Sequence, residues 1–77
     1  MFYVYAIQSL KRNYIYVGMT NDVKRRLNEH NMGANRSTQA YIPFKLILKE
    51  EYTTRVEARK REVHLKSGVG KEYLKSL

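Results

Sequence analysis

Residues 14–30 constrain the fold more than any other stretch of this chain. The stretch opens with Tyr14-Ile15-Tyr16-Val17, a run of aromatic and β-branched residues that favour a β-strand. Gly18 interrupts the run, and Thr20-Asn21-Asp22 then supplies three good N-cap residues for a following helix. The sequence therefore predicts a strand over residues 14–19 and a helix over residues 22–31, joined by a very short connection.

This predicted helix brings chemically active groups together. Arg26 and His30 are four residues apart and therefore share one helical face. Tyr16 lies in the strand that leads into the helix, and Val23 and Leu27 supply the apolar stripe that packs on the core. A guanidinium, an imidazole and a phenol around a glycine indicate a site that handles phosphate.

The charge balance points to a polyanionic partner. The chain has 77 residues, enough for one small domain over residues 1–77, and carries 15 Lys and Arg against 7 Asp and Glu. The formal net charge of +8 favours nucleic acid as the partner over a merely soluble basic surface. Lys24 and Arg25 fall on the solvent side of the helix, so we expect them to contact a nucleic-acid backbone.

Composition also excludes several classes of protein. There is no cysteine, so the chain can form neither a disulfide framework nor a thiolate zinc site. No apolar run approaches the roughly 18 residues of a membrane span, so we expect no membrane partner. Met1 runs directly into strand-like sequence without a charged and apolar leader, which predicts a cytoplasmic protein.

The segments on either side of this stretch complete a mixed fold. Residues 2–8 are apolar on both alternating faces, as in a central or covered strand, and we expect antiparallel pairing with residues 14–19. Gly33 is a natural helix stop, and residues 34–43, including Thr38, resemble an exposed loop. Residues 44–48 predict a third strand.

A second helix follows the third strand. Thr54 and Glu57 fit a capping box that opens a helix through about residue 66. Gly68 and Gly70 predict its end, after which residues 71–77 have room for a last turn or two.

Glu62 is a carboxylate at a position where it needs a positively charged partner. It lies between Ala58 and Leu65 on the inward face of the second helix, where an unpaired charge is costly. The partner is either a cation, Arg26 or a lysine, in a structural salt bridge, or a divalent ion such as Mg²⁺ or Mn²⁺. Spacing alone favours the salt bridge and leaves both open. His64, two residues on, faces away and is predicted to lie on the surface.

Two of the seven tyrosines differ from the rest. Tyr5 and Tyr16 lie on neighbouring predicted strands, which can place both hydroxyls on one face of the sheet. A lone phenol, with a reference pKa of about 10, is a poor base unless a cation assists it. Arg26 is the nearest candidate for that assistance, and its planar fork matches a phosphate.

These residues carry a resemblance to a known family. The triplet Tyr3-Val4-Tyr5, ten intervening residues, and then Tyr16-Val17-Gly18 resemble the paired motif of the GIY-YIG endonuclease superfamily. An arginine follows eight residues after the glycine, and the later segment of residues 58–62 resembles the one that bears the superfamily's metal-binding glutamate. The likeness covers essentially the whole chain and is strongest to small single-domain bacterial members.

The resemblance implies a fold, an activity and a cofactor. The fold is α/β, with a three-stranded antiparallel sheet flanked by helices. The activity is hydrolysis of a DNA phosphodiester with one divalent metal ion, Mg²⁺ or Mn²⁺.

Six residues match the superfamily's site positions: Tyr5, Tyr16, Gly18, Arg26, His30 and Glu62. By resemblance, the two tyrosines line the site and Gly18 keeps room beside the second of them. Arg26 stabilises the phosphate and Glu62 binds the metal.

The resulting hypothesis is a metal-dependent DNA endonuclease of DNA repair or recombination, structure-selective or weakly sequence-specific. Either Tyr5 or His30 takes the proton of the attacking water. Branched or single-stranded DNA is the expected substrate, and a protein partner can supply targeting. The alternatives are a catalytically weak nucleic-acid-binding module and a subunit of a larger repair complex.

Overall fold

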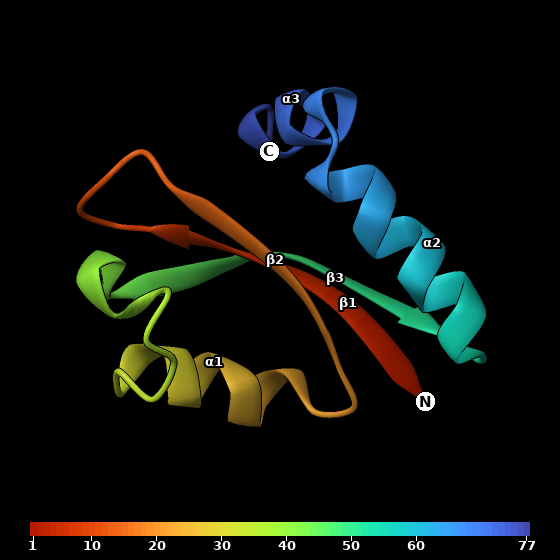
Figure 1. Ribbon diagram of the computed structural model, residues 1–77, viewed down its shortest axis with the longest axis horizontal. Coiled ribbons are helices and arrows are strands. Elements are labelled where there is room, and N and C mark those ends of the chain that lie inside the picture. The colour runs from red at the N-terminus through yellow and green to blue at the C-terminus, as the bar shows by residue number, and fades with distance from the viewer.

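A central sheet separates two helical layers in this protein. The computed structural model describes residues 1–77 and contains three antiparallel strands in the order β2-β1-β3. Figure 1 shows α1 on one side of the sheet and α2 with α3 on the other. The elements are β1 (Phe2–Ser9), β2 (Ile15–Thr20), α1 (Val23–Asn31), the 3₁₀ turn η1 (Gln39–Tyr41), β3 (Phe44–Tyr52), α2 (Arg55–Lys66) and α3 (Gly68–Lys75). The predicted fold class is confirmed.

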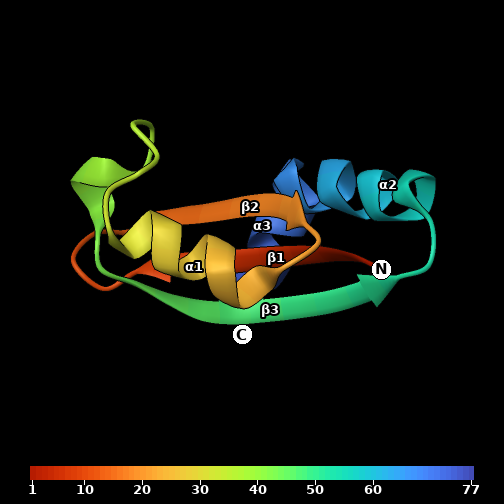
Figure 2. The same cartoon turned by 90° about the horizontal axis from the view of Figure 1, so that it is seen from below.

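β1 is the central strand, and both of its faces are buried. Val4 and Ala6 pack in one apolar cluster with residues of α2 and α3, and both are 0% exposed. Tyr5 and Ile7 pack in a second cluster with Val23 of α1. The alternating side chains of one strand thus form the inner layer of two cores, which confirms that the doubly apolar segment is central. Figure 2 shows β1 between its two partners, with α1 in front of the sheet.

The connection from β2 into α1 positions the residues of interest. Asp22 is the N-cap of α1, and its carboxylate accepts a hydrogen bond of 3.0 Å from the Arg25 amide. Thr20 Oγ1 accepts another from the Asp22 amide, so the turn is held before the helix begins. At the far end Gly33 has a φ of +77°, which favours glycine and ends the helix as predicted.

β3 is longer than the sequence indicates. It extends to Tyr52, whereas the predicted strand ended at Leu48. The added residues include Lys49, Glu50 and Glu51, whose polarity resembles that of a loop. They are accommodated because β3 is an edge strand, where charged side chains are common.

The second helix ends at Lys66 as predicted, but the glycines Gly68 and Gly70 are not what ends it. Ser67 closes α2 and caps α3, accepting a hydrogen bond from the Gly70 amide, and both glycines lie inside α3. A Cβ on Gly70 would lie 2.5 Å from the Cα of Leu65. The missing side chain therefore allows α3 to pack closely against α2 instead of stopping the chain.

The segment after α1 also departs from prediction. Residues 34–43 include η1, and Thr38 is fully buried rather than exposed.

None of the helices has the length and apolar character that crossing a membrane requires.

Candidate active site

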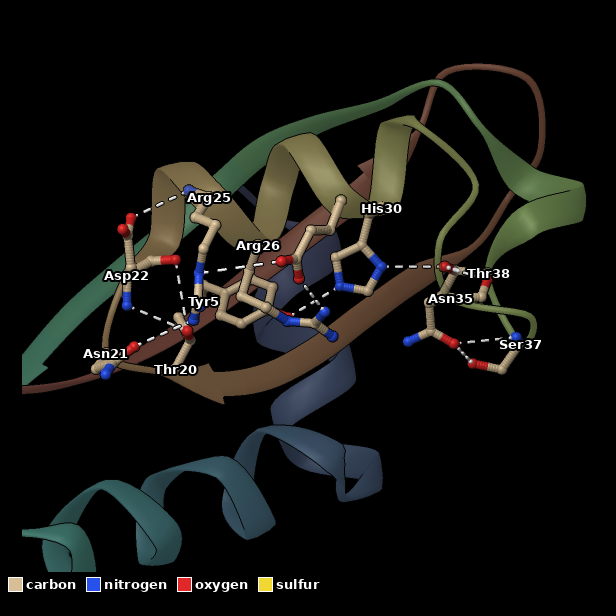
Figure 3. A network of polar contacts seen from close by, with 11 residues as sticks. Tyr5, Thr20, Asn21, Asp22, Arg25, Arg26, His30, Asn35, Ser37 and Thr38 are labelled. Carbon is tan, nitrogen blue, oxygen red and sulfur yellow. Dashed lines mark hydrogen bonds and ion pairs between the residues drawn. The ribbon is translucent and has the colours of Figure 1, made fainter.

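A chain of buried hydrogen bonds links β1 to α1 and to the segment beyond it. The Tyr5 hydroxyl lies 2.9 Å from His30 Nε2, and His30 Nδ1 lies 3.0 Å from Thr38 Oγ1. Figure 3 shows the three side chains in line, each from a different part of the chain. His30 and Thr38 are 0% exposed and Tyr5 is 1% exposed, so all three side chains are buried.

The direction of these hydrogen bonds follows from the last member of the chain. The Thr38 hydroxyl has one proton and donates it to the Asn35 carbonyl, 3.3 Å away, because a carbonyl only accepts. Thr38 Oγ1 must then accept from His30 Nδ1–H. His30 Nε2 is left with its lone pair and accepts the Tyr5 O–H. The geometry thus sets the tautomer of the imidazole and gives the phenolic proton a defined acceptor.

Burial keeps both titratable groups of this network neutral. It raises the pKa of Tyr5 to about 12, an effect that the charge of Arg26 partly opposes. It also lowers the pKa of His30, with a further contribution from the positive charge of Arg26.

Tyr16 joins the cluster from β2. Its ring centroid lies 4.7 Å from that of His30 and 6.2 Å from that of Tyr5. This confirms the prediction that the two tyrosines share a face, because Tyr16 pairs with Ile7 across the strands, two residues from Tyr5.

Gly18 keeps room beside the first tyrosine, not the second as the resemblance implied. It pairs directly with Tyr5 across the strands. A Cβ at position 18 would lie 2.7 Å from the Tyr5 hydroxyl oxygen, which is too close for any side chain. The glycine therefore permits the Tyr5 ring to lie where His30 can accept its proton.

Arg26 lies beside these groups, partly open to solvent. Its guanidinium nitrogen Nη1 makes an ion pair of 2.6 Å with Glu29 Oε1, one turn further along α1. The Glu29 carboxylate raises the pKa of Arg26, and the same contact lowers the pKa of Glu29. The cation is 26% exposed, so an anion from solvent can reach it in exchange for Glu29.

Glu62 belongs to the opposite layer of the molecule. It is buried on α2 between Ala58 and Leu65, as predicted, and its side chain is 10% exposed. Its oxygens lie 3.3 Å from Lys66 Nζ and 3.4 Å from Arg59 Nη1, so its salt-bridge partners are neighbours on its own helix.

The donor set around Glu62 restricts how a metal can bind. The molecule contains no cluster of three or more acidic, histidine or cysteine side chains suited to a metal ion. Mg²⁺ commonly binds one or two carboxylates and completes its shell with water and substrate phosphate. Glu62 fits that pattern as the single protein ligand, together with a bound phosphodiester.

Lys24 and Arg25 are exposed on α1, as predicted. They line a shallow groove of about 380 Å³ that also contains the carboxylates of Asp22 and Glu29. Two cations beside two carboxylates make this face nearly neutral. His64 is exposed on α2, which confirms its surface position.

Sequence reasoning missed two residues that contact the site. Glu29 was detectable, because it stands three residues after Arg26 on the same helix. Thr38 had no such signal: its contact with His30 depends on the path of residues 33–43, which no local pattern specifies.

A sheet that carries two tyrosines on paired strands, followed by a helix with an arginine and a histidine, defines the catalytic domain of a GIY-YIG nuclease. The family model for the GIY-YIG catalytic domain matches residues 1–74. The chain belongs to this family.

Small UPF0213 proteins are among its relatives. One from Streptococcus agalactiae is 43% identical over 53 residues, 68% of this chain and 60% of that protein. One from Staphylococcus epidermidis is 36% identical over 64 residues, 82% of this chain and 78% of that protein. The solution NMR structure of the UPF0213 protein from Bacillus halodurans has a TM-score of 0.58 at 32% identity, covering 99% of this chain and 84% of that one.

Proposed function

We propose that this protein is a metal-dependent endonuclease that hydrolyses DNA phosphodiester bonds. The observation that carries the proposal is the hydrogen-bonded chain from Tyr5 through His30 to Thr38, with Arg26 beside it. A phenol with a defined proton acceptor, next to a guanidinium that can exchange its partner, suits attack of water on a phosphate. Membership of the GIY-YIG family supports the same reaction class.

Tyr5 is the proposed general base. Its phenol takes the proton of the attacking water while its own proton passes to His30 Nε2. His30 then donates from both ring nitrogens, and the bond from Nδ1 to Thr38 holds the ring in place throughout. His30 is less suited to take the water's proton directly, because both of its nitrogens are already hydrogen-bonded, whereas the Tyr5 oxygen, which donates to His30, keeps lone pairs with which to accept a proton. The structure thus favours Tyr5 over His30, the choice that the sequence left open.

Arg26 and Tyr16 are proposed to position the phosphate. Arg26 exchanges the Glu29 carboxylate for a non-bridging phosphate oxygen and stabilises the charge that develops there. Tyr16, half-buried on β2, orients the phosphate or the attacking water.

Glu62 is proposed to hold the divalent ion, Mg²⁺ or Mn²⁺. When bound, the ion supplies Lewis-acid stabilisation of the phosphate and the leaving oxygen. Glu62 must release Lys66 and Arg59 to take this role, which exposed side chains can accommodate.

The proposed biological setting is DNA repair or recombination in the cytoplasm. Structure-selective or weakly specific cleavage is expected, with targeting by a protein partner.

A substrate panel tests this proposal. Linear, flap, branched and single-stranded DNA are incubated with Mg²⁺ or Mn²⁺, with Glu62→Gln as the matched inactive control. We expect metal-dependent cleavage that the variant lacks. Metal-independent binding with no cleavage of any substrate would identify a binding module instead.

A further inference from the structure

Two basic grooves lie along the free edge of β2, and a third, lined by Arg55, Arg59 and Lys60, lies on α2. One groove of about 270 Å³ is lined by residues 14–17 together with Lys66 and Lys71. A second, of about 210 Å³, is lined by residues 13–15 with Lys71 and Lys75 of α3. The two share Tyr14, Ile15 and Lys71 and therefore adjoin each other, and together we call them the β2–α3 groove.

Charge separates this groove from the α1 face. No carboxylate lines either part of the β2–α3 groove. Lys66 is held by Glu62 at 3.3 Å, whereas Lys71 and Lys75 are exposed on α3. Lys75 has only an exposed pair with Glu72 at 3.6 Å, a type of contact that contributes little to stability. Two lysine ammonium groups are therefore available to an anion.

The groove also begins at the candidate active site. Tyr16, which packs against His30, is one of its lining residues, and Lys66 connects it to Glu62. Tyr14 adds an aromatic wall further along, stacked on Tyr41 with ring centroids 4.0 Å apart. Cations that alternate with aromatic rings along a narrow groove are typical of single-strand binding surfaces.

We propose that one DNA strand, leaving the scissile phosphate, runs along the β2–α3 groove in single-stranded form. Its phosphates contact Lys71 and Lys75, and its sugars and bases lie against Tyr14. This inference rests on the proposed nuclease function and names the substrate form that the same site accepts.

Salt dependence of binding tests the groove without requiring cleavage. Affinity for a labelled single strand of about 12 nucleotides is measured by fluorescence anisotropy in EDTA, at several salt concentrations. Neutralising Lys71 and Lys75 to Gln removes two phosphate contacts, which should reduce the slope of log affinity against log salt by about 1.4. The same relation predicts an affinity loss of about 10- to 30-fold near 0.1 M salt.

A charge-matched control separates the groove from net charge. Lys45 and Lys49 are exposed on β3, the opposite edge strand, and their double Gln variant loses the same charge. We expect nearly wild-type affinity from this control. Equal losses in the two double variants, or no loss in Lys71→Gln/Lys75→Gln, would overturn the proposal. A larger effect on a duplex of the same length than on the single strand would overturn the single-stranded form.

Cross-linking gives a second, positional readout. The chain has no cysteine, so Lys71→Cys carries a thiol-linked photo-cross-linker at one unique position. We expect it to label the bound single strand more strongly than the same probe at Lys45→Cys, and equal labelling would contradict the groove.

The two proposals fail differently. If wild-type protein cleaves DNA while the lysine variant binds as wild type does, the groove is wrong and the nuclease stands. If no cleavage occurs but the groove variants lose binding, the nuclease proposal fails alone.

Discussion

The two faces of the sheet hold their polar groups in opposite ways. On the α1 face, Tyr5, His30 and Thr38 are neutral, fully buried and hydrogen-bonded across long stretches of sequence. On the α2 face, Glu62 is charged and held by Arg59 and Lys66, both exposed neighbours on the same helix.

This difference indicates which parts of the site exist before substrate binds. The α1 network is fixed by the tertiary fold and cannot rearrange without exposing unpaired buried groups. The Glu62 pairs are local and their cations face solvent, so Arg59 and Lys66 can move away at little cost. A preorganised proton path and an adaptable carboxylate suit a site in which the metal arrives with the phosphodiester.

The largest expected effect comes from a substitution on the α2 face, at Glu62. Glu62→Gln keeps the side-chain volume and removes the charge, so we expect single-turnover cleavage to fall by about 10³-fold, the equivalent of several kcal/mol. Stability should change by less than about 1 kcal/mol, because the lost pairs involve cations that are 69% and 54% exposed. Thermal unfolding and cleavage assays on one preparation measure both.

Glu51→Gln is the control, since Glu51 is exposed on β3 and its loss changes net charge equally. Wild-type cleavage by Glu62→Gln would contradict the metal-ligand role and would mean that Glu62 only forms salt bridges.

The second largest effect comes from substitutions on the α1 face, at Tyr5 and His30. Tyr5→Phe removes one hydroxyl and with it the proposed base, which is typically worth about 10²–10⁴-fold in rate. DNA affinity should persist. His30→Ala should reduce the rate less than Tyr5→Phe, since water that enters the space of the lost imidazole can accept the phenolic proton of Tyr5 in its place.

Single-turnover rates across pH, corrected for the folded fraction, distinguish the two variants. If His30→Ala abolishes cleavage and Tyr5→Phe is nearly normal, the assignment of the base is reversed.

Local patterns predicted the elements of this fold well and their extent less well. The β2–α1 unit follows from a strand run, a glycine and an N-cap, all of which act within a few residues. The C-terminal part of β3 was missed because its charged residues are tolerated only at a sheet edge, and strand order is a global property. Gly70 was misread as a stop because its role is to allow contact with Leu65 on another helix.

The candidate site shows the same division between what local patterns predict and what depends on tertiary contacts. Tyr5, Tyr16 and His30 were predicted from spacing and resemblance, and the sheet and α1 bring them together. Thr38 was not predicted, since a buried threonine in a polar segment has no periodic pattern. Lys24 and Arg25 were predicted to contact nucleic acid because helix positions can be inferred from sequence, whereas the alignment of α3 with the β2 edge, on which the proposed groove depends, cannot.

A smaller effect sharpens the statement that the α1 network is neutral. Burial lowers the pKa of His30 in the folded protein below its unfolded value of about 6.5. The unfolded chain therefore binds more protons as the pH falls through this range, so the stabilisation present above about pH 6.5 is lost on acidification. Urea unfolding between about pH 5 and pH 7.5 should show stability declining toward the acid end.

His30→Gln should flatten that decline, whereas His64→Gln, at an exposed position, should not. An unchanged pH profile in the His30 variant would mean that other groups produce the acid sensitivity.

The smallest effect concerns the ion pair between Arg26 and Glu29 on α1. Glu29 occupies the Arg26 guanidinium at 2.6 Å and must leave before a phosphate can bind there. Glu29→Gln removes this competitor, and since a partly exposed pair is worth at most about 1 kcal/mol, DNA affinity should rise by no more than about fivefold. Glu51→Gln, which removes the same charge from β3, corrects for the general reduction in repulsion. Anisotropy in EDTA measures both variants, and an affinity gain no larger than that of Glu51→Gln would mean that Arg26 is not the group that receives the phosphate.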